Sequence, residues 1–247
     1  MNGSAAYVYG IVPVDVEVEP GTEGVGEPAG EVRLVPFGEI AALVSDVEVS
    51  RPLGRPGDLR THQRLLDQTS AEVPVLPFRF GAVLTDADAV VEELLKPYHD
   101  DFVGALRDVE GRTQYVVNAR YDEQAILVEV LGENGEAEML RRRIAGQPEA
   151  VTRNERMRLG EIIEGAIAEK RETDTATVVE ELSDLCEQVV VRDPGHERDA
   201  AHVAVLVTQD GQAEFEQAVD ELAGRWQGRA EVRLLGPMAP YDFVGTS

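Results

Sequence analysis

The chain has 247 residues, of which 43% are hydrophobic and 28% charged, a composition typical of a packed globular protein and not of a disordered one. The 23 basic and 47 acidic residues give a net charge of −24. A protein this acidic repels phosphate backbones and anionic lipid headgroups, so we expect no nucleic-acid partner and no membrane partner.

Strand patterns dominate the beginning of the chain. Residues Ala5–Pro13 are rich in Val, Tyr and Ile and end at a proline, which predicts a buried strand. Residues Glu31–Val35 and Ile40–Val47 predict two more strands. Between the first and second strands, Val14–Glu31 mixes acidic residues with Gly and Pro, and we expect a mobile surface loop there.

Helical and irregular segments follow. Asp58 is a candidate N-cap for a helix that runs to Thr69 with its leucines on one face. The next segment, Val73–Leu84, is strongly apolar but contains two prolines, which exclude a helix interior and favour an irregular or edge strand. Asp86 or Thr85 then caps further helical segments.

The second half begins with an alternating strand pattern at Thr113–Tyr121, and Asp122 starts a helix after it. A short helix is expected at Ala137–Ile144. From Thr152 to Val191 the pattern is helical almost throughout. Because β-branched and short polar residues are poor helix formers, we expect this helix to break at Thr173–Thr177.

The end of the chain predicts a strand at Ala201–Thr208, a helix with Phe215, Val219, Leu222 and Trp226 on one face, and a strand at Ala230–Leu235. With the strand near Thr113 this gives a ferredoxin-like order. We therefore predict an α+β fold with two domains. Residues 1–110 would form a mixed α/β sheet domain, and residues 111–247 a ferredoxin-like domain with a long helical insertion and a docked C-terminal tail.

Residues that could carry chemistry are scattered. No two of the four histidines stand at metal-ligand spacing, and His99, Asp100 and Asp101 point to different sides of a helix. Cys186 lies on the apolar stripe of Leu182, Leu185 and Val189, where burial would make its thiol inert. We expect no metal, no cofactor and no catalytic residue.

The expected compartment is the cytoplasm. A single cysteine allows no intrachain disulfide, which suits a reducing environment. The stretch from Met1 to Val14 has no signal-peptide pattern, and no apolar run approaches the roughly 18–20 residues of a membrane span.

Two segments stand out as candidate structural or interaction sites. In VLPFRFG, Arg79 stands alone between Phe78 and Phe80. It either points outward to water from an edge strand or is held by a carboxylate in the core or at an interface, because a buried charge must be paired. We predict a structural partner among the acidic residues, so that Arg79→Ala would cost about 3–5 kcal/mol if the pair is buried. In the tail, Pro237, Tyr241 and Phe243 form an apolar, aromatic ending, for which we favour docking onto the fold over contact with a partner.

Four motifs in this order resemble the gas vesicle protein family GvpF/GvpL. They are AYVYGIV (Ala6–Val12), VPVLPFRFGAV (Val73–Val83) after the helix that contains His62, RLGEIIE (Arg158–Glu164) and LLGPMAPYDFV (Leu234–Val244). The likeness runs over almost the whole chain. One departure is Met238-Ala239, where the family often has Trp-Pro, and it puts the local packing of the tail in doubt.

The resemblance implies a non-enzymatic accessory role in gas vesicle assembly, contact with the hydrophobic shell protein GvpA and with other gas vesicle proteins, and association with the gas vesicle. We expect the chain to bind the shell protein, which would aggregate if left exposed, and to keep it in solution until it joins the wall. A minor component retained on the finished shell is an alternative. The other alternative function is that of a small-molecule enzyme on a ferredoxin-like scaffold.

Overall fold

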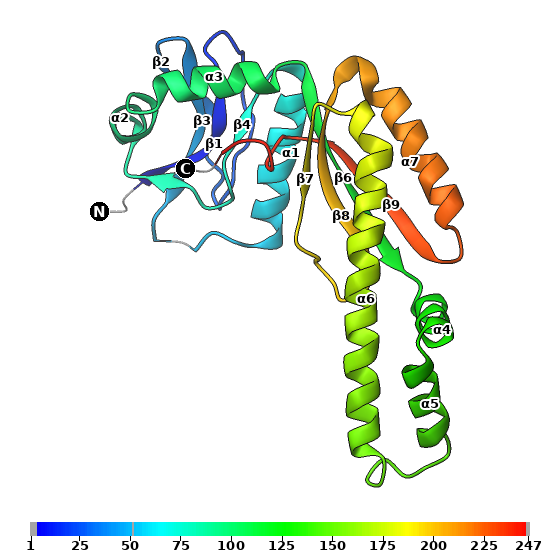
Figure 1. Cartoon of the computed structure of the whole chain (residues 1–247). Coiled ribbons are helices and arrows are strands. Elements are labelled where there is room, and N and C mark those ends of the chain that lie inside the picture. Colours follow the sequence, from blue (N-terminus) through cyan, green and yellow to red (C-terminus); the bar gives the residue numbers. More distant parts are fainter. Residues whose placement is uncertain (1–3, 51, 246–247) are drawn as a thin grey trace. The chain divides into compact units, whose positions relative to one another are not determined.

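The computed structural model describes residues 4–50 and 52–245 (Figure 1). The first three residues of the N-terminal stretch lie outside this range. Helices and paired strands alternate along the chain, which confirms the α+β class. Contacts divide the chain into two compact units. The first contains the residues described up to Tyr115, Leu206–Gln209 and the tail from Gly236 onward, and the second contains Val116–Val205 and Asp210–Leu235.

The predicted domain boundaries stay a prediction. The C-terminal tail, however, does not lie where the sequence analysis placed it. The sequence analysis placed the tail in the second domain, whereas its contacts place it in the first unit. The reason is its hydrogen bonding, which is with Asp67 and Gln114 of that unit.

The first unit is built from a sheet and several helices. Its elements are β1 (Ser4–Pro13), β2 (Arg33–Phe37), β3 (Ile40–Glu48), α1 (Pro56–Glu72), β4 (Leu76–Pro77), β5 (Val83–Leu84), α2 (Ala87–Ala89), the π-helix η1 (Val90–Leu95) and α3 (His99–Val109). The strand order is β2-β3-β1-β4, and β5 also pairs with β1. All of these pairings are antiparallel.

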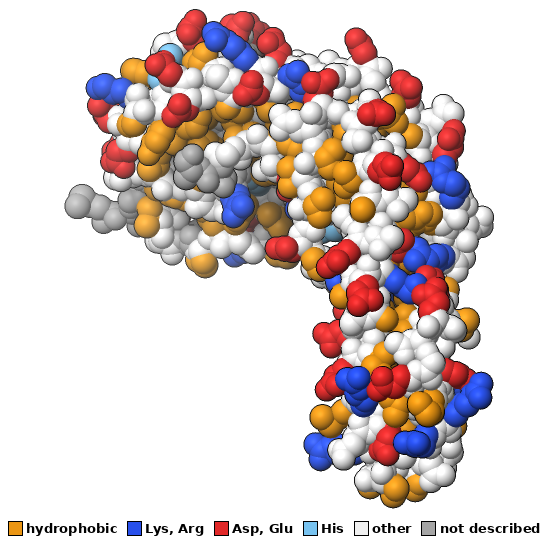
Figure 2. Space-filling model, viewed as in Figure 1, with side chains coloured by type: hydrophobic (Ala, Val, Ile, Leu, Met, Phe, Trp, Pro, Cys, Tyr) orange, Lys and Arg blue, Asp and Glu red, His pale blue; other side chains and the backbone are white. Residues whose placement is uncertain are grey.

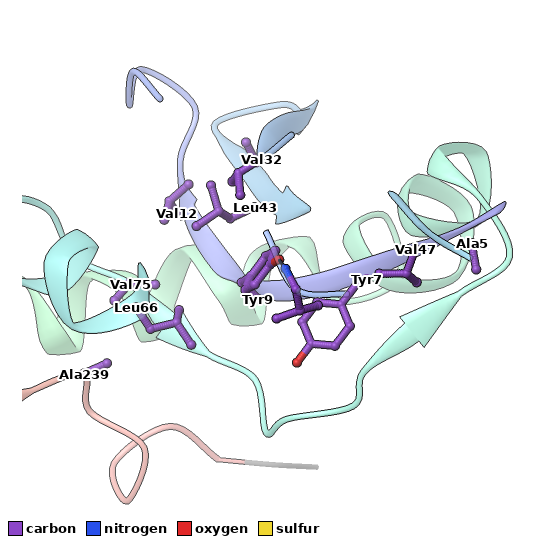
Figure 3. Packing of buried hydrophobic residues seen from close by; sticks show 12 residues of the cluster. Ala5, Tyr7, Tyr9, Val12, Val32, Leu43, Val47, Leu66, Val75 and Ala239 are labelled. Atoms are coloured by element: carbon purple, nitrogen blue, oxygen red, sulfur yellow. Dashed lines mark hydrogen bonds between the residues drawn. The ribbon is translucent and has the colours of Figure 1, made fainter. Parts of the chain in front are cut away.

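Both faces of this sheet are covered, so β1 is buried almost throughout. Alternate side chains of a strand point to opposite faces. On one face Tyr7 and Tyr9 pack with Leu66 of α1 and with Ala239 of the tail (Figure 3). On the other face Val8 and Ile11 pack in the cluster that η1 and α3 complete.

The second sheet contains β6 (Arg112–Tyr121), β7 (Gln188–Val191), β8 (Asp199–Thr208) and β9 (Ala230–Met238), in the order β7-β8-β6-β9. Its helices are α4 (Glu123–Glu133), α5 (Gly135–Ile144), α6 (Arg153–Leu182), the 3₁₀ turns η2 (Ser183–Leu185) and η3 (Gln209–Gly211), and α7 (Gln212–Trp226). Chain order is therefore strand, helices, two strands, helix, strand, which is the ferredoxin-like pattern.

The predicted break in the long helix is wrong. α6 is one continuous helix of 30 residues. The hydroxyls of Thr173 and Thr177 bond back to the carbonyls of Glu169 and Thr173, which satisfies them inside the helix. Thr175 donates to the carbonyl of Ala200, so tertiary contacts override a weak local propensity.

The expected end of this helix at Val191 is also wrong. α6 ends at Leu182, and Gln188–Val191 form the strand β7. Cys186 is therefore not on a helical stripe with Val189; it lies in the connection, half-buried. Burial raises the pKa of its thiol to about 11, and the neighbouring Glu187 and Asp184 add to the effect. The valines of β7 fit a strand as well as a helix face, and the pattern alone did not separate them.

The acidic loop after β1 is anchored by its apolar side chains, contrary to expectation. Val25 is buried in the first core cluster, and its N–H donates to the Tyr9 hydroxyl at 2.7 Å. Gly24 permits this approach: a Cβ there would lie 2.4 Å from both the Tyr9 and Ser45 hydroxyl oxygens. The loop is polar on average, but its few valines reach the core.

Asp58 is not the N-cap of α1 but its third residue, with Arg55 at the cap and Pro56 in the first turn. Its carboxylate accepts from the N–H groups of Gly26, Gly54 and Arg55. Burial opposes ionisation, but these three donors outweigh it and hold the pKa of Asp58 below its usual value. The side chain thus ties the acidic loop to the start of the helix.

We expect Gly24→Ala to lower the free energy of unfolding of the first unit by about 1–3 kcal/mol, because the new methyl group overlaps Tyr9 and Ser45. Gly57→Ala is the matched control in the same unit, since a Cβ there meets nothing within 4 Å. Urea denaturation measures both. Equal stability of the two variants would show that the loop does not pack closely on the sheet.

Candidate interaction surface

The segment between β4 and β5 is an irregular loop that backbone groups hold at both ends. The N–H of Phe78 donates to the carbonyl of Tyr9 at 2.8 Å, and the N–H of Val8 donates to the carbonyl of Ala82 at 2.9 Å. Between these bonds the loop leaves the ladder with β1. On its other edge, β1 shifts register against β3 between Val8 and Gly10. This agrees with the irregular or edge strand predicted from the prolines.

His62 of α1 holds the middle of this loop. It is buried, with 1% of its surface exposed. Its Nε2 lies 3.1 Å from the carbonyl of Phe78, and its Nδ1 lies 2.9 Å from the hydroxyl of Tyr7. A carbonyl only accepts, so Nε2 carries the proton and Nδ1 accepts from Tyr7. The Tyr7 oxygen in turn accepts from the N–H of Gly81 at 3.2 Å.

This chain of bonds requires a neutral imidazole. Burial lowers the pKa of His62, and the bond to the Phe78 carbonyl only partly opposes the effect. Burial also raises the pKa of Tyr7, so its hydroxyl keeps its proton. Both groups are therefore uncharged near neutral pH and suited to position the backbone.

The two phenylalanines of the loop pack into different core clusters. Phe80 lies 5.6 Å from the ring of His62 and 5.8 Å from that of Tyr7. Phe78 packs against Phe102 of α3, with ring centroids 6.4 Å apart. Both side chains are half-buried.

Arg79, between them, is exposed. Within residues 4–50 and 52–245 it forms no ion pair, so the predicted acidic partner is absent and that prediction is wrong; the side chain points outward. The flanking phenylalanines take the two core clusters and leave the guanidinium on the surface. A loss of about 3–5 kcal/mol, which would follow the rupture of a buried pair, is therefore not expected for Arg79→Ala.

The C-terminal tail docks on the first unit. The N–H of Ala239 donates to the Asp67 carboxylate at 3.0 Å. Asp242 and Gln114 form a two-way pair: the Asp242 N–H donates to the Gln114 amide oxygen at 2.9 Å, and the Gln114 amide nitrogen donates to the Asp242 carboxylate at 2.5 Å. Ala239 is fully buried.

The aromatic tail residues differ in burial. Pro237 is exposed, while Tyr241 and Phe243 are half-buried. The Tyr241 ring packs against the first cluster, and its hydroxyl is buried without a hydrogen-bond partner in the described part of the chain. Burial raises the pKa of Tyr241, and nearby Asp67 adds to the effect. The tail and the loop thus rest on the same core.

The second unit contains an ion network that the sequence did not reveal. Arg229 makes a two-pronged contact with Glu129 at 2.8 and 3.2 Å and also reaches Asp174 at 2.8 Å. Lys170 bonds Glu129 at 2.6 Å, and Tyr121 bonds Asp174. These residues lie far apart in sequence, and nothing in their local spacing links them.

The network can hold helices together but is poorly suited to acid–base work. The Arg229 contact, followed by that of Lys170, lowers the pKa of Glu129 to about 2 despite partial burial. A general base needs a pKa near the working pH. The pocket beside the network measures about 500 Å³, and half of the residues that line it are members of these ion pairs: Glu129, Glu133, Lys170, Asp174 and Arg229.

Within the described residues the chain offers neither a group of metal ligands nor a membrane-spanning helix. Nowhere in the described ranges do three or more His, Cys, Asp or Glu side chains converge as a metal site would require. His99 contacts the carboxylate of Asp100, at 3.0 Å. No helix among the described residues is long and apolar enough to cross a membrane.

Comparison with known proteins assigns the family. The family model of the gas vesicle synthesis protein GvpL/GvpF matches residues 5–245. This chain belongs to the GvpL/GvpF family. Gas vesicle protein F of Streptomyces sp. (strain CB03234) is 35% identical over 246 residues, which cover 97% of this chain and 99% of that protein. Gas vesicle protein L of the same organism is 29% identical over 267 residues, which cover 97% of this chain and 92% of that protein.

The fold is also that of a solved GvpF. The crystal structure of GvpF from Anabaena sp. PCC7120 superposes with a TM-score of 0.79 at 24% identity, over 99% of each chain. The resemblance found in the four sequence motifs is therefore confirmed. In this GvpL/GvpF chain, two of those motifs supply Tyr7 and the loop from Phe78 to Gly81, and His62 joins them.

Lowering the pH from 7 to 5 should destabilise the protein through His62. Its folded-state pKa lies below the usual 6.5, so in this range the unfolded chain binds a proton that the folded chain does not. The stabilisation is complete above the unfolded pKa and is lost as the pH falls, with a slope of at most about 1.4 kcal/mol per pH unit.

The variant His62→Gln tests this assignment. We expect it to lose about 1–3 kcal/mol at pH 7, because the Tyr7 hydroxyl and the Phe78 carbonyl lose a well-placed partner. Its stability should also depend less on pH between 7 and 5. Parallel pH profiles of the parent and the variant, measured by urea denaturation, would contradict the role given to His62.

Proposed function

We propose that this chain is a non-enzymatic accessory protein that binds the gas vesicle shell protein GvpA and supports vesicle assembly, with Arg79 at the contact. The observation that carries the proposal is an exposed arginine at the centre of an apolar loop whose neighbours are all anchored. Membership of the GvpL/GvpF family supports the partner class.

The geometry of the loop suits recognition. Arginine is enriched at protein interfaces, where it combines charge with apolar contact. The backbone before Arg79 is held by the bonds of Phe78 to Tyr9 and His62, and the backbone after it by the bond from the Gly81 N–H to the Tyr7 hydroxyl. Little backbone conformational entropy therefore remains to be lost on binding. Val83, at the end of the same segment, is 43% exposed and adds apolar surface.

The net charge of the chain supports a carrier role. A shell protein with exposed strands and apolar faces aggregates unless another surface covers it. A carrier with a net charge of −24 stays dispersed through self-repulsion while its apolar loop is occupied. The same reasoning favours binding over catalysis, since the strongest ionic cluster, around Arg229, is already satisfied internally.

Co-expression with the shell protein tests the proposal. Arg79→Ala should leave the free energy of unfolding within about 0.5 kcal/mol of the parent, because the side chain is exposed. The amount of shell protein in the soluble fraction should nevertheless fall by half or more, because the loss of a contact worth roughly 1 kcal/mol weakens binding about fivefold.

Arg107→Ala is the matched control, because Arg107 is also an exposed arginine of the first unit. It should change neither stability nor the soluble shell protein. If Arg79→Ala and Arg107→Ala retain as much soluble shell protein as the parent, Arg79 is not at the contact.

A further inference from the structure

A second hollow lies along α4 and α6 in the second unit, apart from the pocket beside the ion network. Its volume is about 620 Å³, and it shares no lining residue with that pocket. Its residues come from α4, from α6 and from the connection between β7 and β8. Because all of them line one hollow, they form one continuous surface. We call this hollow the α4–α6 groove.

The deeper part of the groove is apolar. Leu127 of α4 and Ile163 and Ile167 of α6 line it, and each of them is half-buried, whereas the charged Glu164 and Glu197 are exposed. In the view of Figure 2, hydrophobic side chains lie at the surface between acidic and basic ones along the helical hairpin. A contiguous apolar surface with a polar rim is typical of an interaction site.

The shape of the groove fits a helical occupant. The α6 residues that line it repeat at intervals of three and four, as one face of a helix does: Gly160, Ile163, Glu164, Ile167, Ala168 and Arg171. At 1.5 Å per residue, this face runs for about 16 Å, or about three turns. A helix of that length can lie along α4 and α6 with its apolar face inward, as in other helix-in-groove complexes.

The charges of the groove select a basic occupant. Its two arginines are already engaged, because Arg171 donates to two backbone carbonyls and Arg198 pairs with Glu123 at 3.4 Å. The carboxylates of Glu164 and Glu197 form no ion pair in the described part of the chain. A basic side chain can therefore meet them, whereas the net charge of −24 opposes an acidic partner and a second copy of this chain.

We propose that the α4–α6 groove binds an amphipathic helix of a partner protein, with Lys or Arg beside the apolar face of that helix. The apolar side chains of the partner cover Leu127, Ile163 and Ile167, and its basic side chains meet Glu164 and Glu197. The inference does not depend on the proposed function, which uses an arginine of the other unit.

The groove can be filled without disturbing the fold. Gly160 is exposed, and a Cβ added there meets no atom within 4 Å. Gly160→Leu should therefore place a side chain in the groove while thermal stability does not fall, since leucine favours a helix more than glycine does. Ala168→Leu, at another exposed lining residue, should have the same effect on binding.

The binding test uses a labelled helical peptide of about 18 residues, or five turns, with leucines on one face and lysines on the other. Fluorescence anisotropy with the full chain, at an ionic strength of about 0.15 M, should show binding. Gly160→Leu should weaken it at least about tenfold, a loss of about 1.4 kcal/mol.

Gly165→Leu is the matched control. Gly165 is an exposed glycine of the same helix, and a Cβ there also meets no atom within 4 Å, but it does not line the groove. This variant should keep its affinity within about twofold of the parent. Neither glycine substitution changes the charge, so equal affinities of the two variants would overturn the proposal.

Two further measurements address other occupants. A peptide with the same lysines but glutamines in place of the leucines should bind at least about tenfold more weakly. Equal binding of both peptides would overturn the proposal, because net charge alone would then explain the contact. Sedimentation should show that the parent alone does not self-associate through the groove. A dimer that Gly160→Leu dissociates would place a second copy there and overturn the proposal as well.

Discussion

The position of the irregular loop from Phe78 to Gly81 depends on one buried, neutral histidine. His62 donates to the Phe78 carbonyl and accepts from Tyr7, whose oxygen receives the N–H of Gly81. A segment that follows two prolines and leaves the pairing with β1 cannot be held by a regular ladder, so side chains must satisfy its backbone. The result is a fixed loop with its two phenylalanines in the core and Arg79 at the surface.

Much of this fold follows from local pattern. The first strand, the strand at Thr113–Tyr121 and the helix that ends at Trp226 all have clear periodicity, and the structure confirms them. The break expected at Thr173–Thr177 failed because tertiary bonds hold Thr175 in the helix. The acidic loop was misread because two or three valines matter more than its average polarity.

The candidate surface was only partly predictable. The Phe-Arg-Phe pattern drew attention to Arg79, but local sequence left its burial open, and only the packing of both phenylalanines decides it. The partners of His62 are 55 and 16 residues away, so no local spacing reveals that network. A buried histidine beside two tyrosines becomes visible only once the sheet brings them together.

Arginine has different roles across this acidic chain. Arg229 forms ion pairs with Glu129 and Asp174 and so links helices α4 and α6 within the second unit. Arg79, Arg143, Arg153 and Arg156 form no ion pair within the described residues, although carboxylates outnumber basic groups two to one. With so many carboxylates available, an arginine left without one is the more informative case, and it points to contacts with other molecules.

Photo-crosslinking in cells that make gas vesicles tests the central claim most directly. A photoreactive amino acid would replace Arg79 in one variant and Arg107 in another, both exposed positions of the first unit. The account predicts a covalent adduct with the shell protein from position 79 and none from position 107. No adduct from position 79, or equal adducts from both positions, would contradict it.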